Sequence, residues 1–274
     1  MEASQITSEL EALKTKLRAT WIAGDFGEIA KSYAAGAEEF IRGLNLQPGQ
    51  RMLDVACGTG NLALPAARLG AVVTGVDIAP NLIEQARENA KREGLAVQFD
   101  EGDAEKMSYE DASFDAVVTM FGAMFAPRPE LTASEIKRVC RPGGSIAMAN
   151  WTPTGFIGQM FKITASHVPP PPNMPSPVLW GSEEVVRERL SEGTSDLQTS
   201  RESVNFKFPF GPAEVVEHFR LYYGPTNKAF GPLDENGQKA LGAALEQHWT
   251  THNIATDGST EVPSEYLKVV AVRS

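Results

Sequence analysis

The sequence has few of the features that mark secreted, membrane or nucleic-acid-binding proteins. Only two of its 274 residues are cysteines, too far apart in the sequence to form a metal or redox motif, which favours a reducing compartment. Its most apolar stretch, residues 116–126, is far shorter than the roughly 20 residues that cross a bilayer. Lysine and arginine number 25 against 35 acidic residues, and no basic run offsets the net charge of −10. This acidity argues against nucleic acid or an anionic membrane surface as a partner.

The N-terminus and the composition are those of an ordinary globular chain. The first ten residues, MEASQITSEL, have neither a basic start nor an apolar segment, so we expect no signal peptide. Hydrophobic residues make up 42% and charged residues 22% of the chain, which excludes the disordered and disulfide-rich classes. We therefore expect one domain, without a membrane span, in the cytoplasm.

Strand and helix patterns alternate through the middle of the chain. The expected strands cover residues 52–56, 71–78, 96–99, 114–121 and 145–151, and the expected helices cover residues 61–69, 80–94 and 130–140. Pro80 stands at the favoured first position of its helix, and Gly94 stops it. Because the connections are short, the strands should lie parallel with helices on both faces of the sheet.

The flanking segments extend this α/β pattern. Apolar residues at helical spacing predict an amphipathic helix from Ile6 to Trp21, followed by a second helical stretch over residues 29–44. After Trp151 we expect helices at 156–167, 182–190, 212–223 and 238–249, with strands at 199–210 and 266–272. A six-proline tract over residues 168–177 should form an extended loop. The predicted fold is a doubly wound, mostly parallel sheet of seven strands with an antiparallel C-terminal strand and helical cover elements.

The sharpest motif is DVACGTGN, residues 54–61, where an expected strand runs into two glycines and a helix. Glycine lets the backbone approach a ligand closely, and ligands of open parallel sheets bind beyond the carboxyl ends of the strands. Asp77 closes the next strand, seventeen residues after Gly60. A carboxylate at that point can accept hydrogen bonds from both hydroxyls of a ribose.

Two kinds of ligand fit this loop. Gly58, Gly60 and Ala63 match a relaxed dinucleotide fingerprint, which leaves a nicotinamide-dependent oxidoreductase open. Asp54 argues against it, because a carboxylate beside the loop would repel a pyrophosphate. Asp103 adds an acid after the third strand, where an adenine amino group needs an acceptor. Three acids at successive strand ends, with no lysine or arginine among them, indicate a cationic nucleoside, bound by an enzyme or by a non-catalytic module.

With these motifs in this order, the sequence resembles the class I S-adenosylmethionine-dependent methyltransferases. Within that class it is most similar to the small-molecule branch that includes ubiquinone/menaquinone-biosynthesis-like enzymes. The matching segments are LDVACGTG at 53–60, VD at 76–77, GDA at 102–104, FD at 114–115 and RPGG at 141–144. The resemblance covers roughly residues 20–151. It implies a Rossmann-like fold with a helical cover at 1–48, a cofactor-binding core at 49–151, and the rest of the sheet with substrate-cover insertions at 152–274.

The resemblance also implies the cofactor and its contacts. S-adenosylmethionine would bind and leave as S-adenosylhomocysteine. Its expected contacts are Asp54, Ala56, Gly58, Gly60, Asp77, Ile78, Asp103, Ala104 and Met120. Asp54 would lie near the amino group, Asp77 on the ribose and Asp103 at the adenine edge. Ala56 stands where many relatives have glycine, so its methyl group should tighten the loop.

The acceptor is expected to be a small, partly apolar molecule, methylated by in-line displacement. Phe121, Met124, Phe125 and Trp151 are candidates for an apolar surround of the methyl group, and equally for core packing. No catalytic residue is identified, but Tyr222, Tyr223, beside an expected Gly224-Pro225 turn, and His167 are candidates. His248 and His252 share a helix face without a third ligand, so no metal is expected. The sequence does not distinguish a monomer from a homodimer.

Overall fold

One seven-stranded sheet organises the molecule in the computed structural model, which describes residues 2–171 and 174–274, with side chains from residue 11 onward. The strands are β1 (Arg51–Val55), β2 (Val72–Asp77), β3 (Val97–Glu101), β4 (Phe114–Met120), β5 (Cys140–Trp151), β6 (Thr194–Phe208) and β7 (Thr260–Arg273). Their order is β3-β2-β1-β4-β5-β7-β6. The first five strands pair in parallel, and β7 is antiparallel to both β5 and β6. The predicted fold class is confirmed.

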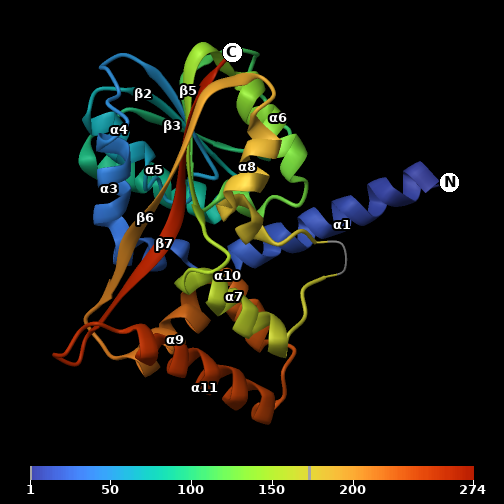
Figure 1. The fold of residues 1–274 in the computed structure, drawn as a ribbon, viewed down its shortest axis with the longest axis vertical. Coiled ribbons are helices and arrows are strands. Elements are labelled where there is room, and N and C mark those ends of the chain that lie inside the picture. Colours follow the sequence, from blue (N-terminus) through green and yellow to red (C-terminus); the bar gives the residue numbers. More distant parts are fainter. Residues whose placement is uncertain (1, 172–173) are drawn as a thin grey trace.

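Helices cover both faces of this sheet (Figure 1). On one face lie α3 (Ala34–Arg42), α4 (Ala63–Arg68) and α5 (Pro80–Glu93), and on the other lie α6 (Pro129–Val139) and α8 (Glu183–Leu190). Pro80 does begin α5, and Gly94 ends it with a φ of +67°, a left-handed cap that favours glycine. Because β1 to β5 are parallel, their carboxyl ends lie together at one edge of the sheet.

A third set of helices gathers beyond the sheet (Figure 1). It contains α1 (Glu2–Ile22), α2 (Phe26–Ala30), α7 (Phe156–His167), α9 (Pro212–Tyr222), α10 (Gly224–Phe230) and α11 (Glu235–His252). Three short 3-10 helices, η1 (Lys31–Tyr33), η2 (Ala123–Phe125) and η3 (Pro177–Gly181), lie between the longer elements. Among the described residues, no helix is long and apolar enough to cross a membrane.

Two details of the chain differ from the sequence prediction or fall outside the structure. The expected turn at Gly224-Pro225 is instead the start of α10, because proline suits the first helical turn. A side chain at Gly224 would stand 2.1 Å from the carbonyl oxygen of Thr20, so α10 and the end of α1 touch through backbone. Part of the proline tract, residues 172–173, lies outside the described residues, and 174–176 form no helix or strand.

Candidate functional site

A cavity opens at the carboxyl ends of β1, β2 and β4. It contains about 920 Å³ of empty space, part of it open to solvent. Of the residues predicted to contact the cofactor, all but Gly60 line it: Asp54, Ala56, Gly58, Asp77, Ile78, Asp103, Ala104 and Met120. The N-terminal helices complete the wall with Lys14, Leu17, Trp21, Phe26 and Tyr33. The sequence pattern did not single out these five as contacts, because they precede the motif by many residues.

Asp77 ties the end of β2 to the glycine loop. One carboxylate oxygen accepts a hydrogen bond from the backbone N–H of Gly58 at 2.9 Å, and the other accepts one from Ala79 at 2.9 Å. The side chain is 92% buried yet lines the cavity, so lone pairs remain for a ligand. Burial raises the pKa of Asp77, and the hydrogen bonds from Ala79 and Gly58 oppose that rise.

Asp54 lies deeper in the same cavity. It is 1% exposed, and its carboxylate accepts a hydrogen bond from the N–H of Ala63 at 3.1 Å. Burial raises the pKa of Asp54 well above its ordinary range, and the negative charge of nearby Asp77 adds to the rise. Neither acid has a salt-bridge partner among the described residues. Two buried carboxylates of this kind favour a ligand that brings positive charge.

The loop between β1 and α4 has two kinds of glycine. Gly58, with a φ of +54°, faces the cavity, where a side chain would approach the ring of Phe26 at 3.4 Å. Gly60, with a φ of +91°, faces the core instead, where a side chain would stand 3.2 Å from both Leu64 and Phe99. Gly60 therefore shapes the turn and packs against the core, and the structure does not place it on the cavity wall.

The expectation that no lysine or arginine lies among the three acids is wrong. Lys14 of α1 forms ion pairs with Asp103 and, at 2.8 Å, with Glu105, whose side chain is fully buried. Arg128 also pairs with Glu105, at 2.7 Å. Lys14 precedes Asp103 by 89 residues, so no local pattern could reveal the contact. The acid at the predicted adenine edge is thus neutralised by a cover helix, whereas Asp54 and Asp77 are not.

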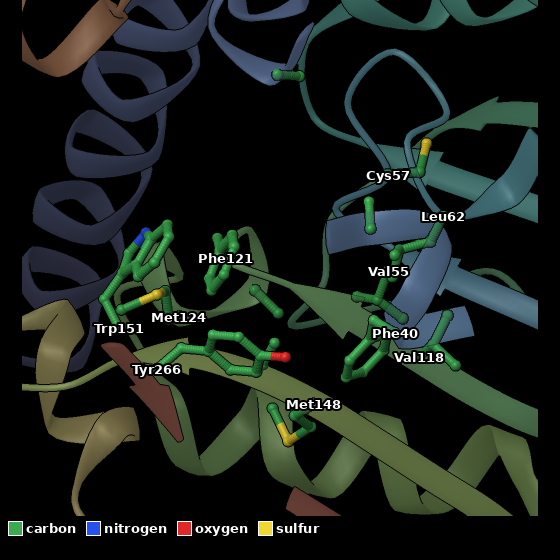
Figure 2. Close-up of a cluster of buried hydrophobic side chains, with 14 of the residues drawn as sticks. Phe40, Val55, Cys57, Leu62, Val118, Phe121, Met124, Met148, Trp151 and Tyr266 are labelled. Carbon is green, nitrogen blue, oxygen red and sulfur yellow. The ribbon is translucent and has the colours of Figure 1, made fainter. Parts of the chain in front are cut away.

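The end of β4 also lines the cavity, and its backbone is strained. Met120, Phe121 and Gly122 line the cavity, and Phe121 has a φ of +61°, which is rare for a bulky residue. Its ring stacks on Trp151 with centroids 3.5 Å apart. Figure 2 shows these two rings beside Met124 and Tyr266 at one end of the buried cluster. Packing on several sides therefore holds Phe121 in this conformation.

Comparisons with known proteins place these motifs in one family. Residues 53–148 match the family described as "Methyltransferase domain". The chain is 36% identical over 268 residues to the uncharacterized protein Rv1405c of Mycobacterium tuberculosis, a match that covers 96% of each chain. It is also 36% identical over 125 residues to demethylmenaquinone methyltransferase of Deinococcus radiodurans, covering 44% of this chain and 52% of that one.

The chain belongs to the class I S-adenosylmethionine-dependent methyltransferases. Among solved structures, Haemonchus contortus phosphoethanolamine N-methyltransferase 2, in complex with S-adenosyl-L-methionine, has a TM-score of 0.59 to this methyltransferase at 20% identity. That match covers 91% of this chain and 57% of the other. S-adenosylmethionine is the cofactor of this family. Its positive sulfonium and ammonium groups suit the two unpaired acids of the cavity.

Next to the cofactor cavity of the methyltransferase lies a smaller space of about 330 Å³, part of it open to solvent, which we call the aromatic annexe. It is lined by Trp21, Phe26, Ile29, Tyr33, Phe121, Phe125, Trp151, Ile157, Met160, Phe206, Phe219 and Tyr223. Three of the four predicted apolar residues, Phe121, Phe125 and Trp151, therefore face one of the two spaces, whereas Met124 faces neither.

The candidates for a catalytic group are separated by the fold. Tyr223 lines the annexe, but the ring of Tyr222 packs on His218 at 4.7 Å. Consecutive residues at the end of α9 point in different directions, so the pair does not act as one feature. His167 stands in the last turn of α7, and neither it nor Tyr222 lines either space.

The remaining histidine pair is bound to the backbone. Nε2 of His248 lies 3.0 Å from the carbonyl oxygen of Phe156, and Nδ1 of His252 lies 2.9 Å from that of His248. Burial lowers the pKa of His248, so this ring stays neutral. In the part of the chain that the structure describes, no three metal-ligating side chains come together.

Proposed function

We propose that this methyltransferase moves the methyl group of S-adenosylmethionine to a small-molecule acceptor by in-line displacement. The cofactor supplies a methyl group already activated by positive sulfur. The observation that supports the proposal most is the pair of buried acids without a salt-bridge partner among the described residues, Asp54 and Asp77, on the wall of a mostly apolar cavity. We assign Asp77 to the ribose and Asp54 to the amino group. Asp103 and Ala104 would lie at the adenine edge, with Met120 next to the methyl group.

The residues of the chain position the acceptor and exclude water from the reacting groups. Phe121, which follows β4, lines both the cavity and the annexe, and Gly122 lines the cavity. An acceptor held there attacks the methyl carbon from the side opposite sulfur, and its lone pair forms the new bond as the carbon–sulfur pair returns to sulfur. Because the sulfonium charge disappears in this step, an apolar surround is compatible with a fast reaction. Both cysteines are buried and unpaired, which agrees with the cytoplasm as the site of action.

Titration with S-adenosylhomocysteine tests the cofactor assignments. Asp77→Asn should weaken binding at least about tenfold, because a charge-assisted hydrogen bond contributes about 1.5–3 kcal/mol. The matched control is Asp100→Asn, on the adjacent strand and outside the cavity, which should bind as the unchanged protein does. Equal affinities of the two variants for S-adenosylhomocysteine would contradict the assignment of Asp77 to the ribose.

Turnover distinguishes an enzyme from a binding module. Incubated with S-adenosylmethionine and a small-metabolite extract, the protein should release S-adenosylhomocysteine, and Asp77→Asn should release less. Cofactor binding without product from extracts would contradict a catalytic role. Product formed only with protein or nucleic acid would contradict a small-molecule acceptor.

A further inference from the structure

A fully buried carboxylate, that of Glu105, lies behind the expected adenine edge of the cofactor cavity. Unlike Asp103 and Ala104, which precede it, Glu105 does not line the cavity. Removing a carboxylate from water is expensive unless cations and hydrogen-bond donors take the place of the water. Two cations do so here, because Lys14 pairs with Glu105 at 2.8 Å and Arg128 pairs with it at 2.7 Å.

Arg128 binds this carboxylate with its backbone as well as its side chain. Its N–H donates to Oε1 of Glu105 at 2.5 Å, and its Nε donates to Oε2 at 2.8 Å. Hydrogen bonds between charged groups, made to both oxygens, hold a carboxylate in one orientation. Arg128 also directly follows Ala126 and Pro127, which line the cavity after β4. Glu105 is therefore held firmly against the segment that follows β4.

Lys14 connects this fixed carboxylate to Asp103. Its ammonium group forms ion pairs with both acids, and Lys14 and Asp103 both line the cavity. Burial disfavours the charge of Lys14, but the hydrogen bonds to Asp103 and Glu105 outweigh burial and raise the pKa of Lys14. The other oxygen of Asp103 accepts a hydrogen bond from the N–H of Glu105 at 2.9 Å. Both oxygens of Asp103 are thus bound, which fixes the orientation of its carboxylate.

The fixed carboxylate of Asp103 still has lone pairs for a ligand. A carboxylate has about four lone-pair sites, and its side chain is 30% exposed at the cavity wall. An amino group on a purine ring can donate to it, whereas a carbonyl oxygen at the same place would face it lone pair to lone pair. Because two acids hold the Lys14 ammonium, turning it toward such a carbonyl would break an ion pair.

We propose that Glu105 and Lys14 are positioning residues that make the cofactor site select a nucleoside with an amino group on its purine ring over one with a carbonyl oxygen there. This inference rests on the proposed function, which assigns Asp103 to the adenine edge. Glu105 holds Lys14, and Lys14 holds the Asp103 carboxylate in the orientation that accepts from the amino group. A carboxylate that could turn away would discriminate less between the two bases.

Calorimetric titration with S-adenosylhomocysteine and S-inosylhomocysteine tests the inference, because the two ligands differ only in their purine base. The unchanged protein should bind the adenine ligand at least tenfold more tightly. Lys14→Met and Glu105→Gln should each reduce this preference at least threefold, mainly by weakening the binding of S-adenosylhomocysteine. Arg18→Met removes contacts of the same helix with Ile78 and Glu101, and it should weaken both ligands by the same factor.

The comparison of two ligands separates positioning from a general loosening of the fold. Lys14→Met leaves the pair of Glu105 and Arg128 in place, so it decides the test alone if Glu105→Gln does not fold. Lys31→Met, which removes an exposed ion pair, should change neither affinity. A preference that Lys14→Met leaves unchanged or increases would overturn the inference, and so would equal binding of both ligands by the unchanged protein. Failure of the unchanged protein to bind either ligand would instead refute the proposed function.

Discussion

Two strained residues line the cofactor cavity where the neighbouring strands β1 and β4 end. Ala56 and Phe121 have φ angles of +56° and +61°, in the left-handed region that disfavours side chains. Such residues cost about 1–3 kcal/mol each and persist only where the surroundings enforce them. The methyl group of Ala56 fits because Gly122 opposite has none. The methyl group of Ala56 is thus accommodated by the glycine that follows β4.

Gly122→Ala should destabilise the protein by about 1–3 kcal/mol. The added methyl group would lie 2.6 Å from both the Cβ and the carbonyl oxygen of Ala56, and the backbone oxygen cannot rotate away. Urea unfolding without cofactor measures the loss. Gly242→Ala is the control, because its methyl would meet only Phe230, at 4.0 Å, and alanine suits the interior of α11. Equal unfolding free energies for the unchanged protein and Gly122→Ala would show that the end of β4 can shift away from Ala56 at no cost in stability.

Asp54 should make stability depend on pH in an unusual direction. Its pKa is raised by burial, so the folded state binds a proton more readily than the unfolded chain. Its favourable contribution is complete below the ordinary pKa of 3.8 and is lost as pH rises through the raised pKa. Asp54→Asn should therefore raise the free energy of unfolding at pH 8 by on the order of 1 kcal/mol more than at pH 5.

Asp115 provides the opposite sign for comparison. Hydrogen bonds from the N–H of Arg51 and from Arg141 lower the pKa of Asp115, so its contribution is present above the ordinary pKa and lost in acid. Asp115→Asn should thus cost more at pH 8 than at pH 3. Urea unfolding across this range measures both variants, and an Asp54→Asn effect that is the same at pH 5 and pH 8 would contradict the assignment.

Among the elements, α1 is attached in part by charged side chains. In Figure 1 its first turns project away from the other helices. Its second half is held by Lys14 on Asp103 and Glu105, and by Arg18, which donates to the carbonyl oxygen of Ile78 at 3.1 Å. These contacts, together with Trp21, make α1 a wall of the cofactor cavity.

Lys14→Met should loosen α1 and cost about 1–3 kcal/mol, since it leaves the buried Glu105 carboxylate with Arg128 alone. Hydrogen exchange should become faster at the amides of the second half of α1 and remain unchanged in β1 to β5. Lys31→Met removes an exposed ion pair with Glu28 and should change the free energy of unfolding by less than about 1 kcal/mol. Protection of α1 that is unaffected by Lys14→Met would show that apolar packing alone holds it.

The elements of the core were predictable because each is signalled locally. Apolar runs, Pro80 and Gly94 mark strands and helix ends within a few residues, and the glycine loop and Asp77 follow at fixed spacing. α10 was missed because its Gly-Pro start also suits a turn. The Lys14–Asp103 pair and the annexe could not be predicted, because they join distant segments of the chain, 89 residues apart in the case of the ion pair, and tertiary packing alone brings these together.

At the scale of the whole molecule, the fold brings residues from distant parts of the chain together at the site. Strand ends supply the acids, the N-terminal helices supply one aromatic wall, and the segment after Trp151 supplies the other. Binding at such a junction should stabilise the complete fold. S-adenosylhomocysteine at a hundred times its Kd adds about 2.7 kcal/mol, which should raise Tm by roughly 5–10 °C. NADH at the same concentration should leave Tm unchanged, and a larger shift with NADH would contradict the cofactor assignment.

The central claim is that the acids at the strand ends hold a positively charged nucleoside, with the reactive group facing the aromatic annexe. A crystal structure with bound S-adenosylhomocysteine measures this directly. Its ribose hydroxyls should lie on Asp77 and its sulfur should face the wall formed by Phe121 and Gly122. A ribose away from Asp77, or a diphosphate bound over Gly58 in crystals soaked with NADH, would contradict it.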